Sequence, residues 1–116
     1  MICDQWDVVV VPFPFSERAG QRRRPALVLS LRDFNCSGHT VMAMITTQTH
    51  HPWPADCHIQ DLDRAGLPSP CIVRLKVFTL DNRLIVRCCG ALASQDRESV
   101  QEAISFQFHS AESHVD

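Results

Sequence analysis

The sequence contains no tyrosine, only four glycines and no apolar run that approaches the roughly 18 residues of a membrane-spanning helix. A chain without tyrosine has no phenol for acid–base or nucleophilic chemistry. No GxGxxG motif, phosphate-binding loop or GxSxG nucleophile motif is present. These absences exclude a membrane span and the commonest nucleotide-binding and hydrolase signatures.

The sequence also gives no sign of secretion. The longest early apolar run, Val8 to Phe15, is interrupted by two prolines and has no basic leader before it, so it lacks the pattern of a signal peptide. The six cysteines therefore have no secretory context that would favour disulfides. We expect free thiols in a protein of the reducing cytoplasm.

The charges are few and unevenly distributed. The chain has 116 residues, which corresponds to one domain, and a net charge of −2. Residues 1–90 carry 10 basic and 8 acidic groups, whereas residues 91–116 carry 1 and 5. Ten of the 11 cations are arginine, which holds phosphate in a fixed fork of donors. This balance excludes a basic coat over the whole surface but permits a local basic patch.

Short β-branched runs separated by polar loops predict a mostly β protein. Strands are expected at residues 8–11, 26–29, 40–47, 57–59, 71–80 and 83–89. Residues 32–38 are expected to form a loop, and Asp81-Asn82 suits a two-residue hairpin turn between the last two strands. One helical turn at residues 61–66 is expected to end at Gly66.

The end of the chain predicts one helix. Ser94 is expected to cap it, and Val100, Ile104 and Phe108 form one apolar stripe at four-residue spacing. Together with the strands, this predicts a small, mostly antiparallel barrel with a C-terminal helix. A single domain over residues 1–116 is expected, with a frayed tail at 110–116.

A basic run is the first candidate site. Four arginines lie within seven residues: Arg18, Arg22, Arg23 and Arg24. Such a concentrated positive field attracts phosphates, although a solvated loop explains the same run. Arg24 differs from the others because it directly precedes Pro25 and a strand. We therefore expect its guanidinium to be held at the rim of the core.

Two further strands carry polar side chains. Thr46 and Thr47 end the third expected strand, where their hydroxyls can bind a phosphate oxygen or serve only as β-formers. Arg74 and Lys76 share one face of the strand at 71–80. Either an exposed sheet face or an anionic ligand beside Arg24 and Thr46 explains that pair.

The loop at residues 49–56 holds the remaining candidates. Trp53 lies between two prolines, where its ring can either stack on a base or cover an edge of the core. His50, His51, Cys57 and His58 form a cluster of metal-binding residue types. Their spacing fits no standard zinc pattern, so no metal site is expected.

Four blocks of the sequence together resemble the PemK/MazF family of bacterial toxins of type II toxin–antitoxin systems. They are DVVVVPFPFS at 7–16, RRPALVLS at 23–30, AMITT at 43–47 and IVRLKVFTLD at 72–81. The resemblance runs from about Asp7 to Ile104. It implies an SH3-like antiparallel barrel with a C-terminal helix.

The resemblance also implies a function. Members of the family are cytoplasmic homodimers that bind single-stranded RNA in a groove at the dimer interface. They are metal-independent, cofactor-free endoribonucleases that cut mRNA at short sequences. A cognate antitoxin occludes the groove, and operator DNA is reached only through the antitoxin complex.

Residue roles follow from the same resemblance. In the family, the Arg before the Pro and the Thr that ends the third strand are the active-site pair, which match Arg24 and Thr46. Arg74 matches a strand arginine that contacts substrate and, in some members, takes part in proton transfer. The expected RNA-binding residues are Arg22, Arg23, Thr47, Lys76 and Trp53.

The chain departs from the family pattern at two positions. Lys76 stands where some members have an Asp that is the proposed general base. The base is therefore unassigned, with Glu17, His50 and His51 as loop candidates, and the pH–rate profile is expected to lack a sharp acidic limb near about pH 4–5. Trp6 stands where many members have Gly.

A non-catalytic protein on the same fold is the alternative. Such a protein would be a gyrase-inhibiting toxin or a degenerate member that only binds an antitoxin. The set Arg24, Thr46 and Arg74 favours the enzyme, because a binding protein has no need of it. The missing Asp favours the alternative, and cleavage of RNA distinguishes the two.

Overall fold

The computed structural model describes residues 1–13, 22–47 and 51–110. Six strands form one antiparallel sheet in the order β4-β5-β3-β2-β1-β6. The strands are β1 (Asp7–Pro12), β2 (Arg23–Val28), β3 (His39–Thr47), β4 (Cys57–His58), β5 (Cys71–Asp81) and β6 (Arg87–Ala91). The helices are α1 (Arg32–Asn35), α2 (Leu62–Ala65), the 3-10 turn η1 (Asn82–Leu84) and α3 (Ser94–Phe108).

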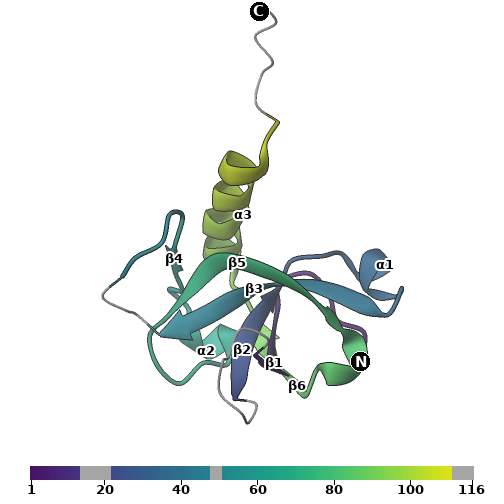
Figure 1. Cartoon of the computed structure of the whole chain (residues 1–116). Coiled ribbons are helices and arrows are strands. Elements are labelled where there is room, and N and C mark those ends of the chain that lie inside the picture. The colour runs from purple at the N-terminus through teal and green to yellow at the C-terminus, as the bar shows by residue number, and fades with distance from the viewer. Residues whose placement is uncertain (14–21, 48–50, 111–116) are drawn as a thin grey trace, which may run out of the picture.

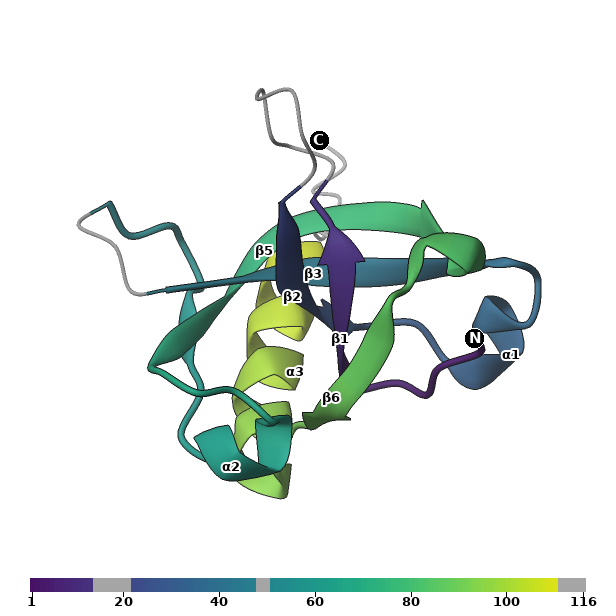
Figure 2. The ribbon, with the colours of Figure 1, turned by 90° about the horizontal axis from the view of Figure 1, so that it is seen from below.

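The sheet curls into a half-barrel. Figures 1 and 2 show β5 arching along the long strand β3, while β1 and β6 form the other side of the curve. The C-terminal end of α3 projects away from the sheet (Figure 1). The predicted small antiparallel barrel with a C-terminal helix is confirmed. In the described part of the chain, no helix has the length and apolar character needed to cross a membrane.

The alternation of side chains along the strands divides the core into two clusters. One cluster includes Val8, Leu27 and Ile45 and extends to Leu92 and Val100, so it lies between the sheet and α3. The other includes Val9, Ala26 and Met42 together with Phe13, Phe78 and Ile85. The second cluster belongs to the opposite face of the same strands, because neighbouring residues of a strand point to opposite sides.

The predicted hairpin at Asp81-Asn82 is wrong. β5 and β6 lie at separate places in the sheet, and β5 pairs with β3 as far as His39 opposite Asp81. The chain then turns through η1, where the buried Asn82 accepts a hydrogen bond of 2.7 Å from Thr40 Oγ1. This buried polar contact directs the chain away from β5 and toward the free edge of β1, where β6 pairs.

Two further elements differ from the sequence-based expectation. Residues 32–38 contain the helical turn α1, which is anchored because the buried Asn35 donates hydrogen bonds to the carbonyls of Cys3 and Ser30. β2 begins at Arg23 rather than after Pro25. Pro25 is accommodated inside the strand, opposite Val10.

The predicted C-terminal helix begins at Ser94, but Ser94 does not cap it. Ala93 is the N-cap and makes no side-chain capping bond. Along the predicted apolar stripe, Val100 is buried, Ile104 is partly buried and Phe108 is 65% exposed. The stripe therefore packs only through the first part of α3, and the last turn stands clear of the core.

Two backbone positions have positive φ angles that explain local sequence choices. Trp6 has φ 76°, the left-handed region that glycine adopts most easily, at the position where many PemK/MazF members have Gly. Gly66 ends α2 with φ 73°, as predicted. A Cβ at Gly66 would lie 2.2 Å from the Cys89 carbonyl oxygen, so this glycine allows α2 to press against β6.

Candidate active site

Arg24 and Thr46 come from neighbouring strands. β2 pairs with β3 from Val28 opposite Met42 to Ala26 opposite Met44, and alternation along the two strands puts Arg24 and Thr46 on the same face of the sheet as these pairs. Residues opposite each other in an antiparallel pair point to the same face. Thr46 is 7% exposed, whereas Thr47 is exposed and points to the other face by alternation. The Arg24 and Thr46 side chains therefore share one face of the sheet, and Thr47 lies on the other.

Arg24 is half-buried, and its guanidinium packs on an aromatic ring. Its guanidinium carbon lies 5.8 Å from the centroid of the Phe13 ring, which packs in the second core cluster. In the described ranges, no carboxylate lies within ion-pair distance of Arg22, Arg23 or Arg24. The aromatic ring orients the guanidinium without neutralising it.

Arg74 lies on β5, which pairs with the other edge of β3. Its environment differs from that of Arg24. Arg74 is directly opposite Met44 on β3, so its backbone is about 10 Å from β2 at the usual strand spacing. Its guanidinium donates from Nε to Asp56 Oδ1 at 3.1 Å and from Nη2 to Asp56 Oδ2 at 2.9 Å. A further bond of 3.2 Å runs from Nη2 to the carbonyl of His51. Both side chains of the ion pair are 9% exposed.

This ion pair fixes the protonation state of both partners. Burial alone would raise the pKa of Asp56, but the hydrogen bonds from Arg74 and from the Trp53 backbone N–H outweigh it and lower the pKa below the ordinary value. The same hydrogen bonding, which Arg74 donates to Asp56, raises the pKa of Arg74. At neutral pH, Asp56 is therefore a carboxylate and Arg74 a cation.

The Trp53 ring packs against the charged groups of Arg74 and Lys76 and not against the hydrophobic core. Its ring lies 5.3 Å from the Arg74 guanidinium carbon and 5.8 Å from Lys76 Nζ, and the residue is 42% exposed. The pairing of β3 with β5 shifts between Ala43 and Met44, so two residues of β5 bulge out before Val77. Arg74 and Lys76 nevertheless meet on the ring of Trp53, which connects the 51–56 segment to β5.

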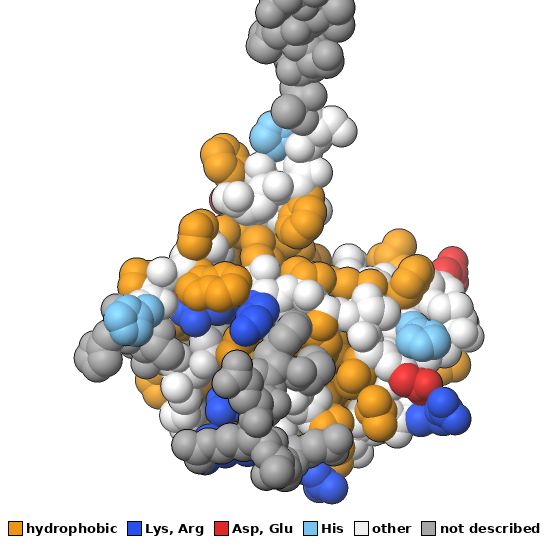
Figure 3. All heavy atoms as spheres, viewed as in Figure 1, with side chains coloured by type: hydrophobic (Ala, Val, Ile, Leu, Met, Phe, Trp, Pro, Cys, Tyr) orange, Lys and Arg blue, Asp and Glu red, His pale blue; other side chains and the backbone are white. Residues whose placement is uncertain are grey.

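The basic side chains form a patch. On the face drawn in Figure 3, Lys and Arg side chains gather over the end of β3 and the start of β2, beside a large hydrophobic side chain. Arg22 and Arg23 are exposed and Arg24 is half-buried at the start of β2. The described part of the chain thus places its predicted phosphate-binding residues at one end of the sheet.

Sequence reasoning missed Asp56. It follows Pro54-Ala55 in a segment with no regular structure, so no periodicity marked it. The signal that could have indicated it is chemical: Arg74 lies in the first part of β5, where four successive residues are buried, and a buried guanidinium needs a carboxylate partner. Of the candidate bases, Glu17 and His50 lie outside the described residues, and His51 contributes its backbone carbonyl to Arg74.

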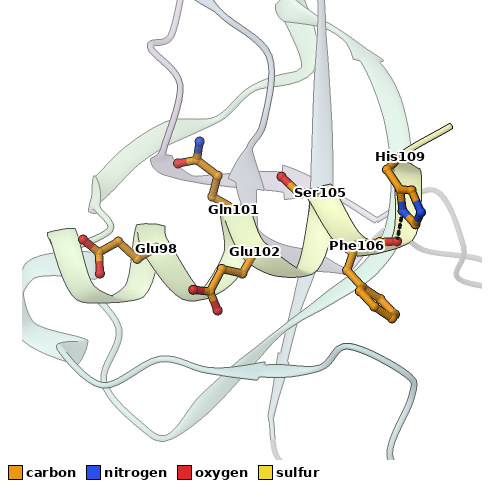
Figure 4. A pocket seen from close by; sticks show the side chains of 6 residues that line it. All are labelled: Glu98, Gln101, Glu102, Ser105, Phe106 and His109. Carbon is orange, nitrogen blue, oxygen red and sulfur yellow. Dashed lines mark hydrogen bonds between the residues drawn. The ribbon is translucent and has the colours of Figure 1, made fainter.

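A hollow of about 680 Å³ lies along α3 and differs chemically from the basic patch. Glu98 and Glu102 line it together with Gln101, Ser105, Phe106 and His109 (Figure 4). His109 Nδ1 lies 2.8 Å from the Phe106 carbonyl oxygen (Figure 4). Two carboxylates in this hollow oppose the approach of a phosphate. Among the described residues, no group of three His, Cys, Asp or Glu side chains is placed to hold a metal ion.

Comparison with known proteins identifies relatives over most of the chain. The family described as PemK-like, MazF-like toxin of type II toxin–antitoxin system matches residues 4–108. The comparison with curated proteins finds no match.

Solved structures share the fold at low sequence identity. MazF in a MazE–MazF crystal structure from Deinococcus radiodurans is 19% identical, with a TM-score of 0.75 over 96% of this chain and 100% of the other. Toxin MazF-mt6 from Mycobacterium tuberculosis is 18% identical, with a TM-score of 0.71 over 91% and 99%. An endoribonuclease from a mycobacterial species, solved with its cognate antitoxin, is 12% identical, with a TM-score of 0.71 over 97% and 98%.

Proposed function

Because the chain belongs to the family of PemK-like, MazF-like toxins of type II toxin–antitoxin systems, we propose that it is an endoribonuclease that cuts single-stranded mRNA at a short sequence without a metal ion. The observation that carries this proposal is the charge of Arg24. Its guanidinium lies over the Phe13 ring, shares a face of the sheet with Thr46 and has no carboxylate partner in the described ranges.

The reaction begins with the nucleophile that RNA itself supplies. The 2′-oxygen attacks the adjacent phosphorus, so the O2′–P bond forms and the P–O5′ bond breaks. The 2′-OH loses its proton and the departing 5′-oxygen gains one. The products are a 2′,3′-cyclic phosphate and a 5′-OH end. Negative charge grows on the phosphoryl oxygens in the transition state, where Arg24 and the Thr46 hydroxyl stabilise it.

Arg74 has an electrostatic role in this proposal. Asp56 holds it protonated, because its hydrogen bonds raise the pKa of Arg74. A guanidinium that does not release its proton is a poor acid or base. Arg74 therefore contributes a fixed positive charge near the phosphate, and Asp56 and Trp53 are positioning residues that hold it in place.

Asp56 does not replace the missing Asp as a base. Asp56 has a lowered pKa, and both of its oxygens accept hydrogen bonds from Arg74. Its affinity for a proton is therefore low. Charge stabilisation dominates the mechanism, and the pH–rate profile should lack a sharp acidic limb near about pH 4–5. A steep limb in that range would contradict this view.

Binding residues and partners complete the proposal. Arg22 and Arg23, with Lys76 and Trp53, hold the RNA strand beside Arg24, whereas Thr47, which was predicted with them, points to the other face of β3. The protein acts in the cytoplasm as a homodimer, and a cognate antitoxin occludes its groove and connects it to operator DNA. Support for the antitoxin comes from two structural relatives, whose titles describe a MazE–MazF complex and an endoribonuclease with its cognate antitoxin.

The test is cleavage of a long RNA in excess EDTA, with the ends of the fragments mapped. Wild-type protein should cut at a recurring short sequence and leave cyclic phosphate and 5′-OH ends. Replacing the nucleotide before the cut by its 2′-deoxy form should abolish cleavage, because the nucleophile is gone. Arg24→Ala should cut roughly 10²–10³-fold more slowly, since it removes one preorganised charge stabiliser.

Arg83→Ala is the matched control. Arg83 is an exposed arginine whose partner is Asp81, at the far end of β5, so its loss changes the net charge equally and should leave cleavage unchanged. Intact RNA in the presence of folded, dimeric wild-type protein would contradict the proposal and favour the non-catalytic alternative. Normal cleavage by Arg24→Ala would show that the site is assigned to the wrong residue.

A further inference from the structure

Asp96 is a buried carboxylate in the first turn of α3, outside the candidate active site. The residue is only 2% exposed. Each of its two oxygens accepts a backbone hydrogen bond: Oδ1 from the Gln60 N–H at 2.9 Å, and Oδ2 from the Asp61 N–H at 3.0 Å. Burying a carboxylate costs free energy unless its oxygens are hydrogen-bonded. Asp96 therefore binds the chain at Gln60 and Asp61 firmly to α3.

The chain that Asp96 binds includes β4, which directly follows one partner of the buried ion pair. β4 is two residues long and is an edge strand of the sheet. Its first residue, Cys57, is opposite Val73 of β5, and the residues next to this pair are Asp56 and Arg74. A strand of two residues forms few ladder hydrogen bonds with its neighbour. The contacts of this segment with α3 therefore matter for its position.

α3 runs beside β4 and contacts it at a second point (Figure 1). The Cys57 thiol lies 3.6 Å from the carbonyl oxygen of Ser99, one helical turn after Asp96. Burial, and then the carboxylates of Asp56 and Asp96, raise the pKa of the Cys57 thiol. At neutral pH this thiol therefore keeps its proton and can donate it to the Ser99 carbonyl. Two successive turns of α3 thus hold the chain, one at β4 and one just after it.

The position of the Arg74 guanidinium depends on the same part of the chain. Arg74 donates hydrogen bonds to both oxygens of Asp56 and to the His51 carbonyl. Its guanidinium also lies over the ring of Trp53. All three partners belong to residues 51–56, which directly precede β4. A shift of β4 would therefore move the partners of Arg74 and the guanidinium with them.

We propose that Asp96 is a positioning residue of the candidate active site: by holding β4 and the turn after it against α3, it sets where the Arg74 guanidinium lies. The inference rests on the proposed function, since the place of this guanidinium matters for cleavage only if RNA is cut here. The chain of contacts runs from Asp96 through the turn after β4 to Asp56 and Arg74.

The test uses Asp96→Asn, which keeps the size of the side chain and replaces one acceptor oxygen by an NH2 donor. One of the two buried backbone N–H groups then faces a donor and loses its hydrogen bond. The first measurement is hydrogen exchange of the Arg74 Nε–H, followed by heteronuclear NMR and assigned by its absence in Arg74→Lys. This proton should exchange roughly 10-fold faster in Asp96→Asn, as expected for the loss of one buried hydrogen bond.

Core backbone amides, such as those of Val9 and Ile45, report global unfolding in the same experiment. The Arg74 Nε–H should therefore accelerate more than these amides do. Equal acceleration of all of them would overturn the proposal, because Asp96 would then serve only the overall stability. An unchanged exchange rate at Arg74 would overturn it as well.

Cleavage of RNA is the second measurement. A misplacement of about 1 Å costs up to roughly 10²-fold in rate, so Asp96→Asn should lower kcat roughly 10-fold. KM should stay within about 2-fold of wild type, because the Arg74 charge acts mainly in the transition state. In the double variant Asp56→Ala with Arg74→Met, which lacks the ion pair, adding Asp96→Asn should not lower kcat further. Additive effects on kcat would overturn the proposed route through Arg74.

Asp61→Asn is the matched control, since it removes the same charge from the same turn. The Asp61 side chain caps α2 by accepting a hydrogen bond of 3.0 Å from the Arg64 N–H, and asparagine is an equally good cap. Exchange at Arg74 and cleavage should therefore match wild type in this variant. Circular dichroism checks that each variant is folded.

Cys57→Ala keeps the test available if Asp96→Asn does not fold. It removes the thiol contact with the Ser99 carbonyl, so the Arg74 Nε–H should exchange faster in this variant too. An unchanged rate would overturn the proposal.

The two proposals fail in different ways. Faster exchange at Arg74 in Asp96→Asn, in a protein that leaves RNA intact, would support the positioning by Asp96 and contradict the nuclease. Sequence-specific cleavage by wild type, with wild-type exchange and kcat in Asp96→Asn, would support the nuclease and contradict the positioning.

Discussion

Two arginines near one end of the sheet, Arg24 on β2 and Arg74 on β5, have opposite electrostatic environments. Arg74 is 7% exposed and donates hydrogen bonds from Nε and Nη2 to Asp56 and from Nη2 to the His51 carbonyl. Arg24 is half-buried, lies over an aromatic ring and has no carboxylate partner in the described ranges.

This difference separates a role in the stability of the fold, for Arg74, from a role in RNA cleavage, for Arg24. A buried guanidinium with its carboxylate is a matched pair, and removing one member leaves an uncompensated charge in the interior. A guanidinium without a counterion is available to a phosphate, and little of the fold depends on its charge. We therefore expect substitutions near Arg74 to act mainly on folding and substitutions of Arg24 to act mainly on cleavage.

The largest expected effect is the roughly 10²–10³-fold loss of cleavage in Arg24→Ala. The comparison adds a second expectation: the free energy of unfolding of this variant should stay within about 0.5 kcal/mol of wild type. Urea unfolding at a fixed protein concentration measures it. A strongly destabilised Arg24→Ala would mean that both arginines are structural.

Asp56→Ala should destabilise the protein by about 3 kcal/mol, because it leaves the Arg74 guanidinium buried without a counterion. The measurement is again urea unfolding. Asp81→Ala is the matched control, since it breaks the exposed Arg83–Asp81 pair at the end of the same strand. The double variant Asp56→Ala with Arg74→Met should recover part of the loss. If Asp56→Ala and Asp81→Ala lowered the free energy of unfolding by equal, small amounts, the buried pair would be no more important for stability than the exposed one.

Low pH should weaken the ion pair between Arg74 and Asp56. The pKa of Asp56 is lowered in the folded protein, so its stabilisation is fully present above the unfolded-state pKa of about 3.9. It is lost as pH falls through the lower, folded-state value. The difference in unfolding free energy between wild type and Asp56→Asn should therefore shrink as pH falls from about 6 to about 2. A constant difference over this range would contradict the assigned pair.

The smallest expected effect belongs to Trp53. Trp53→Leu removes the ring under Arg74 and Lys76 and should cost about 1 kcal/mol, as for a partly exposed cation–π contact. Trp53→Phe keeps a ring and should lose less. Unfolding is followed by circular dichroism, because one of the two tryptophans is removed. Identical stabilities of the two variants would show that the contact with the ring contributes nothing.

Several features of this protein were predictable because local chemistry decides them. β-branched runs predicted most of the strands, and DLDRAG predicted the turn that Gly66 ends with its positive φ. The blocks around Arg24, Thr46 and Arg74 carried the family resemblance, which the match over residues 4–108 confirms. The catalytic roles of these three residues stay a prediction.

Other features depend on partners that lie far away in the sequence. The hairpin was wrong because Asn82 is held by Thr40, and β6 pairs with β1, which begins the chain. The role of Trp53 was open because its ring meets two cations from β5. Asp56 was missed because nothing in its own segment marks it as a partner of Arg74.

The sequence by itself determined which residues are strands, where positive charge is concentrated and which family the chain resembles. Hydrophobic alternation, turn residues and motifs act over a few positions, so they can be read along the chain. Only the tertiary structure decided that Arg74 is paired with a carboxylate and that Arg24 has none among the described residues. That outcome depends on whether a carboxylate lies within about 3 Å of the guanidinium, and contacts of that kind form between segments that the fold, and not the sequence order, brings together.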